Sequence, residues 1–195
     1  YLVDLPLDAR GKPAKLKKKQ PVLLFARPVA GARPGANSTG SVQLVAPDAQ
    51  LPWDPATEAQ LRAILTELVK PGAPPAVTGV ANGFHVPGTL PGEGETQLFL
   101  DTKTGEPVSL TILTAADGSR RWAAAFGEIV DGSAAVPARD TLAWYRLACG
   151  LPHQLPLAKL AGTAPEDRKK AASDYAVVLG ALGECTRTRT PPVGP

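Results

Sequence analysis

Residues 96–131 read TQLFLDTKTGEPVSLTILTAADGSRRWAAAFGEIVD, and this stretch decides the fold. It contains three runs rich in β-branched and aromatic residues, separated by Thr-Gly-Glu-Pro and Asp-Gly segments that are typical of turns. The pattern predicts a three-stranded antiparallel meander. In the middle run Val108, Leu110 and Ile112 alternate with other residues, so we expect one face of the sheet to be mostly apolar.

An apolar sheet face needs a cover, and helical patterns at 55–70, 138–149 and 164–186 provide one. We therefore expect an α+β fold with these three helices packed on the sheet. Asp54 is suited to cap the first helix, whose apolar residues form one stripe. Thr163 and Glu166 have the spacing of a capping box for the third helix, whose apolar repeat places Cys185 on its buried face.

The domain organisation follows from composition along the chain of 195 residues, 44% of them hydrophobic. We expect a basic arm over 1–20, a single α+β domain over 21–186, and a Pro-rich tail over 187–195; two small domains are the alternative. Residues 76–95 begin as a strand and then read as a Gly/Pro-rich loop, and Phe84 and His85 lie just before this loop. Such loops often carry binding residues.

The basic charge is concentrated in one place. The chain has a net charge of +3, and removing the five lysines at 12, 15, 17, 18 and 19 leaves −2 for all other residues. Nucleic-acid binding is disfavoured, because no aromatic residue lies between Tyr1 and Phe25 to stack on bases. The arm is either a solvated segment or a contact for an anionic surface, made by Lys15, Lys17, Lys18 and Lys19.

Several features favour an exported protein, in the periplasm, on the cell surface or secreted, and the Ala/Pro/Gly-rich composition suggests a bacterial source. The chain contains no methionine, which suggests that a signal peptide has been removed, and a lipid anchor upstream of Tyr1 stays open. No run of about 18 apolar residues is present, so no transmembrane segment is expected. The two cysteines, Cys149 and Cys185, are expected to form a disulfide; free thiols in a cytosolic protein are the alternative.

Catalytic and metal-binding patterns are weak. The chain has only two histidines and no CxxC, so we expect no metal site and no cofactor. No G-x-S-x-G elbow is present, which leaves His85 and Glu128 as weak catalytic candidates. Glu128 shares a predicted strand face with Trp122 and Phe126, where a carboxyl group could have a shifted pKa.

One basic-aromatic triplet stands out in the sequence. Arg120 and Arg121 precede Trp122, and two guanidinium groups beside an indole suit a carboxylate or phosphate ligand. The alternative is that the arginines only keep a strand end soluble. Together with Phe84 and His85, these three are the candidate binding residues of the folded domain.

Two functions follow from these patterns. The favoured one is a non-catalytic extracytoplasmic protein that serves as a ligand-binding module or as a subunit of a cell-envelope assembly, with a protein or envelope component as its partner. The alternative is an exported, hydrolase-like enzyme of unfamiliar type that uses His85 or the acids near Glu128. A concave pocket that holds two of these groups within hydrogen-bond reach would favour the enzyme.

Overall fold

A computed structural model of the chain describes residues 10–13, 18–28, 42–127, 134–160 and 164–185. The chain folds as two compact units, Tyr1–Arg62 and Ala63–Pro195, and each is described by itself. The arm over 1–20, the single domain over 21–186 and the tail over 187–195 stay predictions.

The second unit is built on a four-stranded antiparallel sheet with the strand order β5-β6-β7-β8. Its strands are β5 (Val77–Pro87), β6 (Gly94–Thr102), β7 (Val108–Thr114) and β8 (Arg120–Phe126). The α+β class and the meander are confirmed. Residues 76–95 begin as a strand, as predicted, but this strand, β5, continues to Pro87 and so takes up part of the predicted loop. Two register shifts, at Val77/Gly79 and Val80/Asn82, interrupt the alternation of β5, so its sequence lacks a regular period of two.

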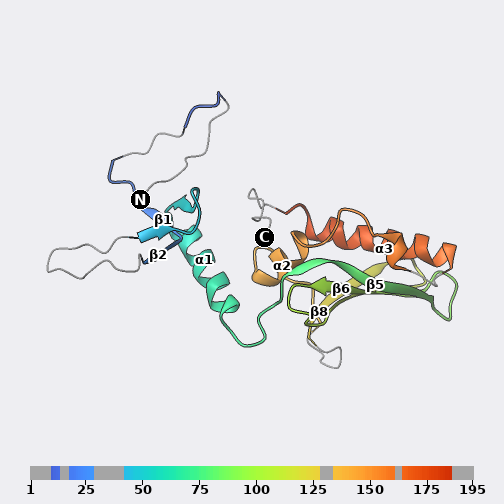
Figure 1. The fold of residues 1–195 in the computed structure, drawn as a ribbon. Helices are drawn as coiled ribbons and strands as arrows, with labels where there is room; N and C mark the ends of the chain where they lie inside the picture. The colour runs from blue at the N-terminus through green and yellow to red at the C-terminus, as the bar shows by residue number, and fades with distance from the viewer. Residues whose placement is uncertain (1–9, 14–17, 29–41, 128–133, 161–163, 186–195) are drawn as a thin grey trace. The chain divides into compact units, whose positions relative to one another are not determined.

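Besides the end of α1 (Pro55–Leu68), the described part of this unit contains two helices and a short 3-10 helix: α2 (Leu142–Ala148), η1 (Leu157–Lys159) and α3 (Pro165–Leu182). Figure 1 shows α3 lying along one face of the sheet, where it packs against β5, β6 and β8. The core lies between this face and the helices. Its fully buried large side chains come from both layers and include Leu98, Leu110, Ile112, Trp144, Leu147, Tyr175 and Val178.

Both ends of α3 differ from the sequence prediction. The N-cap is Ala164, which forms no side-chain cap, and Pro165 occupies the first turn. The predicted cap, Thr163, lies outside the described residues. The helix ends at Leu182 because Gly183 has a φ of 72°, a left-handed conformation that favours glycine. Cys185 therefore lies beyond the helix rather than on its buried face.

The first unit contains short antiparallel pairs and the first half of α1 (Pro55–Leu68). Strand β1 (Val22–Leu24) pairs with β4 (Gln50–Pro52), and β2 (Ala26–Pro28) pairs with β3 (Val42–Leu44).

The predicted cap of α1 is confirmed. Asp54 Oδ1 accepts hydrogen bonds from the backbone N–H groups of Ala56 and Thr57, both at 2.9 Å, and the Thr57 hydroxyl lowers the pKa of the Asp54 carboxyl. The helix itself buries none of its residues. Because α1 spans the boundary of the two units, its packing on the sheet stays a prediction, and the described cover of the sheet comes from the C-terminal helices.

Candidate functional site

A buried carboxylate on α3 meets a side chain from each of the four strands. Asp174 is 1% exposed, and it accepts hydrogen bonds from the hydroxyls of Thr96 on β6 at 2.5 Å and Thr114 on β7 at 3.4 Å. Arg120 Nε on β8 lies 2.9 Å from Asp174 Oδ1, and His85 Nδ1 on β5 lies 3.7 Å from Oδ2. We call these five residues the Asp174 cluster.

Strand register and helix period bring the cluster together. His85 is directly opposite Thr96 across β5 and β6, and Thr114 is opposite Arg120 across β7 and β8, so all four side chains lie on the covered face. Asp174 follows Ala171 by three residues and precedes Val178 by four, which places a carboxylate in the buried stripe of α3. Asp174 is absent from the site residues predicted from the sequence, although an acidic residue within an apolar stripe is a visible signal.

His85 is held inside the cluster. The Thr96 hydroxyl donates its single proton to Asp174, so His85 Nδ1, 2.9 Å from Thr96 Oγ1, must be the donor of that contact. The edge of the imidazole packs against Gly94, where an added Cβ would lie only 2.7 Å from His85 Nε2. The His85 side chain is 5% exposed, so the ring is closed off from solvent.

The cluster is suited to holding α3 on the sheet rather than to catalysis. Thr96 is fully buried and Asp174 nearly so, and a substrate has no access to either oxygen in this structure. One carboxylate and one guanidinium balance in charge when the imidazole is neutral. Arg120 also donates from Nη2 to Ser173 Oγ at 3.1 Å, which adds a second link between β8 and α3.

Alternation along β8 separates the predicted basic-aromatic triplet. Arg120 and Trp122 lie on the covered face, where Arg120 joins the Asp174 cluster and Trp122 packs against the core. Arg121 lies on the opposite face and is exposed. The three side chains therefore do not form one binding site, and only Arg121 is available to a ligand on the uncovered face.

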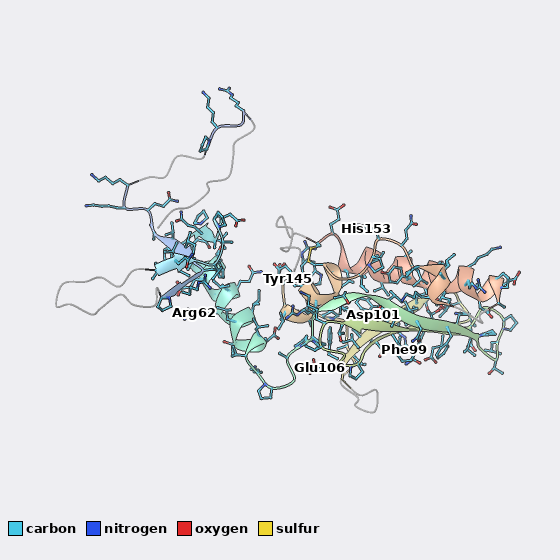
Figure 2. All side chains as sticks on the ribbon, in the orientation of Figure 1. Arg62, Phe99, Asp101, Glu106, Tyr145 and His153 are labelled. Carbon is cyan, nitrogen blue, oxygen red and sulfur yellow. A yellow bond between two sulfur atoms is a disulfide. The ribbon has the colours of Figure 1, made fainter. Side chains whose placement is uncertain are left out.

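The uncovered face of the sheet carries exposed apolar side chains, and we call it the open face. Phe84, Val86 and Leu113 are 39%, 51% and 43% exposed, and the Phe84 and Phe99 rings lie 6.3 Å apart. Figure 2 shows Phe99 on the side of the sheet away from α3. Phe84, predicted as a binding residue, belongs to this face, whereas its neighbour His85 points the other way.

A shallow depression of about 280 Å³ lies at one end of the open face. Its lining includes Val86 and Leu113 together with the carboxylates of Glu93 and Glu95. Glu93 is engaged in the β5–β6 turn, where its Oε2 accepts a hydrogen bond from the Leu90 N–H at 3.2 Å. Glu95 forms no such contact with any described residue, so its carboxylate is available to a cationic group.

The second histidine lies on the helical side of this unit. Two cavities of about 250 and 600 Å³ flank His153 and Leu179 along α3, and the larger also contacts Glu184 and Cys185. Their lining is mainly apolar, and its polar side chains are those of His153, Gln154, Tyr175 and Glu184. Within the described residues, no group of three or more His, Cys, Asp or Glu side chains could hold a metal ion.

The chain ends of α2 and α3 are joined as predicted. Cys149, the C-cap of α2, and Cys185 form a disulfide with a Cα–Cα distance of 5.0 Å. Nearby, Tyr175 donates a hydrogen bond from its hydroxyl to the Pro152 carbonyl at 2.7 Å, and burial raises the pKa of this phenol well above its usual value.

The described part of the chain contains no helix long and apolar enough to cross a membrane.

The remaining predicted site residues lie in or next to segments without a description. Lys18 and Lys19 are exposed, whereas Lys15, Lys17 and Glu128 fall outside the described residues. The anionic-surface contact of the arm and the catalytic role of the acids near Glu128 therefore stay predictions.

Fold and site together define an α+β protein with one covered and one open sheet face. No protein-family model matches the chain, and neither a curated protein nor a solved structure is significantly similar to it. The chemistry of the two faces is therefore the basis for assigning a function.

Proposed function

We propose that this chain is a non-catalytic, exported bacterial protein that acts by contact, as a binding module or a subunit of a cell-envelope assembly, through the open face of its sheet. The observation that carries this proposal is the contrast between the two faces. The predicted catalytic candidate His85 and its neighbour Asp174 are sealed on the covered face, while exposed apolar side chains gather on the open one. Exposed apolar side chains grouped on one face mark interaction sites.

The contact chemistry of the open face supports protein binding over small-molecule binding. The depression described on this face is shallow, whereas ligand sites for small molecules are concave and enclose most of the ligand. Aromatic side chains such as Phe84 and Phe99 are enriched at protein interfaces, where flat apolar area is buried. Export is supported by the disulfide, because disulfides persist mainly outside the cytoplasm.

A site-specific photo-crosslinker tests the proposal. The full chain is prepared with a photoreactive amino acid in place of Phe84 and, as a matched control, in place of Leu157, which is similarly exposed (46%) but lies on the helical side. After irradiation with an envelope fraction of the source organism, we expect protein adducts from position 84 and none from position 157.

Two results contradict the proposal. Adducts from position 157 alone would move the contact to the helical side of the unit. Turnover of an ester, peptide or glycoside substrate that is lost in His85→Gln, with folding retained, would instead establish an enzyme. A comparison of thermal unfolding between the two chains verifies that the substitution leaves the fold intact.

A further inference from the structure

One row of the open face, meaning a set of residues paired side by side across the four strands, carries a carboxylate and a guanidinium group. Val86, Glu95, Leu113 and Arg121 are paired in register across β5, β6, β7 and β8. Glu95 and Arg121 lie on either side of Leu113, two strand spacings apart, which is about 10 Å. Neither side chain forms a hydrogen bond or ion pair with another described residue, so both charges are available for an external partner.

In the neighbouring row, the side chains on β6 and β8 differ in size. Gln97 on β6 and Ala123 on β8 flank Thr111 on β7, so β6 carries the longer side chain and β8 the shorter one. The side chains on β6 and β8 therefore differ in charge in the first row and in size in the second, so that each one fits against the other. A surface with this property is complementary to itself after a two-fold rotation.

The geometry of such a rotation can be worked out from the sheet. A two-fold axis parallel to β7 turns a second sheet over, so that β6 of one copy lies above β8 of the other, with the two sheets about 10 Å apart. Glu95 then faces Arg121 of the second copy, and Gln97 faces its Ala123. Leu113 faces its own equivalent at the axis.

We propose that the open face is a two-fold interface between two copies of this chain, in which Arg121 of each copy enters the depression of the other. This dimer rests on the proposed binding function of the open face and names the partner. The depression presents the Glu95 carboxylate beside Val86 and Leu113. This combination suits arginine, whose stem packs on apolar surface while its guanidinium pairs with a carboxylate.

The dimensions of the sheet imply a weak, reversible dimer. With the axis along β7, three strands of each copy, β6 to β8, overlap over a width of about 14 Å, and a strand of seven residues such as β7 is about 24 Å long. Each copy therefore offers roughly 350 Å², and the pair buries roughly 700 Å², which is below the size of stable interfaces and fits only a weak, transient contact. We expect dissociation in the micromolar range and a dimer that weakens at high salt, because its two ion pairs lie near the surface.

Sedimentation velocity of the full chain at about 1–200 µM tests the inference, since this range brackets micromolar dissociation. The wild-type protein should change from monomer to dimer across the range. Arg121→Glu and Glu95→Arg should each weaken the dimer at least about tenfold, because each places two like-charged pairs across the axis. The double variant Glu95→Arg/Arg121→Glu should recover most of the affinity, because it restores opposite charges at both contacts.

Leu113→Asp and a matched control separate the interface from general surface effects. Leu113→Asp should abolish the dimer because it buries two carboxylates at the axis, whereas Leu157→Asp, on the helical side, should leave it unchanged. A monomer at every concentration would overturn the inference, as would a dimer that Arg121→Glu leaves intact or that the double variant fails to restore. A monomer that still forms adducts from position 84 would overturn only the dimer, whereas a monomer that forms no adducts would count against the binding function itself.

Discussion

The substitution Asp174→Ala should strongly destabilise the second unit. It removes the carboxylate that accepts from Thr96 and pairs with Arg120, and it leaves the guanidinium without its counter-ion. Removing one partner of a buried ion pair costs about 3–5 kcal/mol. The lower part of that range applies here, because the Arg120 side chain is 28% exposed and water can partly solvate it. We expect a loss of about 3 kcal/mol, or about 10 °C in Tm for a unit of this size.

Urea unfolding followed by tryptophan fluorescence measures this loss, because Trp144 is 2% exposed and its indole donates to the Leu182 carbonyl at 3.0 Å. The matched control is Asp101→Ala, whose carboxylate is half exposed and lies 4.0 Å from Lys159 Nζ. Such surface pairs contribute less than about 1 kcal/mol. Asp174→Asn should be intermediate, since it keeps the shape and one acceptor but loses the charge.

A double-mutant cycle with Arg120→Ala identifies the partner. The coupling free energy between the two positions should be about 1–3 kcal/mol, the range for side chains in direct contact within one network. A free energy of unfolding for Asp174→Ala within about 1 kcal/mol of the wild-type value would refute the reasoning, because exposed positions tolerate changes of that size. Additive effects of the two substitutions would show that Asp174 acts without Arg120.

Three further predictions concern the rest of the chain. Reduction of the Cys149–Cys185 disulfide, whose cysteines are 36 residues apart, should lower the free energy of unfolding by about 4 kcal/mol according to the chain-entropy relation. Mass spectrometry after alkylation of the unreduced native protein should detect no modified thiol. Burial raises the pKa of Tyr175, so the folded state retains a proton that the unfolded state loses above about pH 10. The free energy of unfolding should therefore fall as the pH rises past that value. Urea titrations at about pH 8–11 measure this dependence, and Tyr175→Phe should remove it. Charge reversal of the lysines at 17–19 should weaken binding to anionic vesicles, and salt near about 0.5 M should do the same by screening. Equal binding by a chain trimmed to 21–186 would show that the arm is not the contact.

Local patterns in the sequence predicted much of the second unit. The three runs within 96–131 became β6, β7 and β8 because alternation and turn residues act over neighbouring positions. Asp54 caps α1 for the same reason, since its acceptors and donors lie within three residues. The disulfide was also predictable, because two cysteines near the ends of two helices have few other roles in an exported protein.

Tertiary structure decided what each side chain does. Thr96 and Asp174 are 78 residues apart in the chain, and only the docking of α3 on the sheet makes a buried cluster of them. His85 is sealed and Phe84 exposed because strand β5 points adjacent side chains to opposite faces, and bulges concealed that strand from any regular pattern. The apolar stripe of α1 has the period of a buried helix and yet buries none of its residues. The spacing of apolar residues along the chain determines only which of them share a face of the helix. Their burial depends on whether another part of the protein packs against that face.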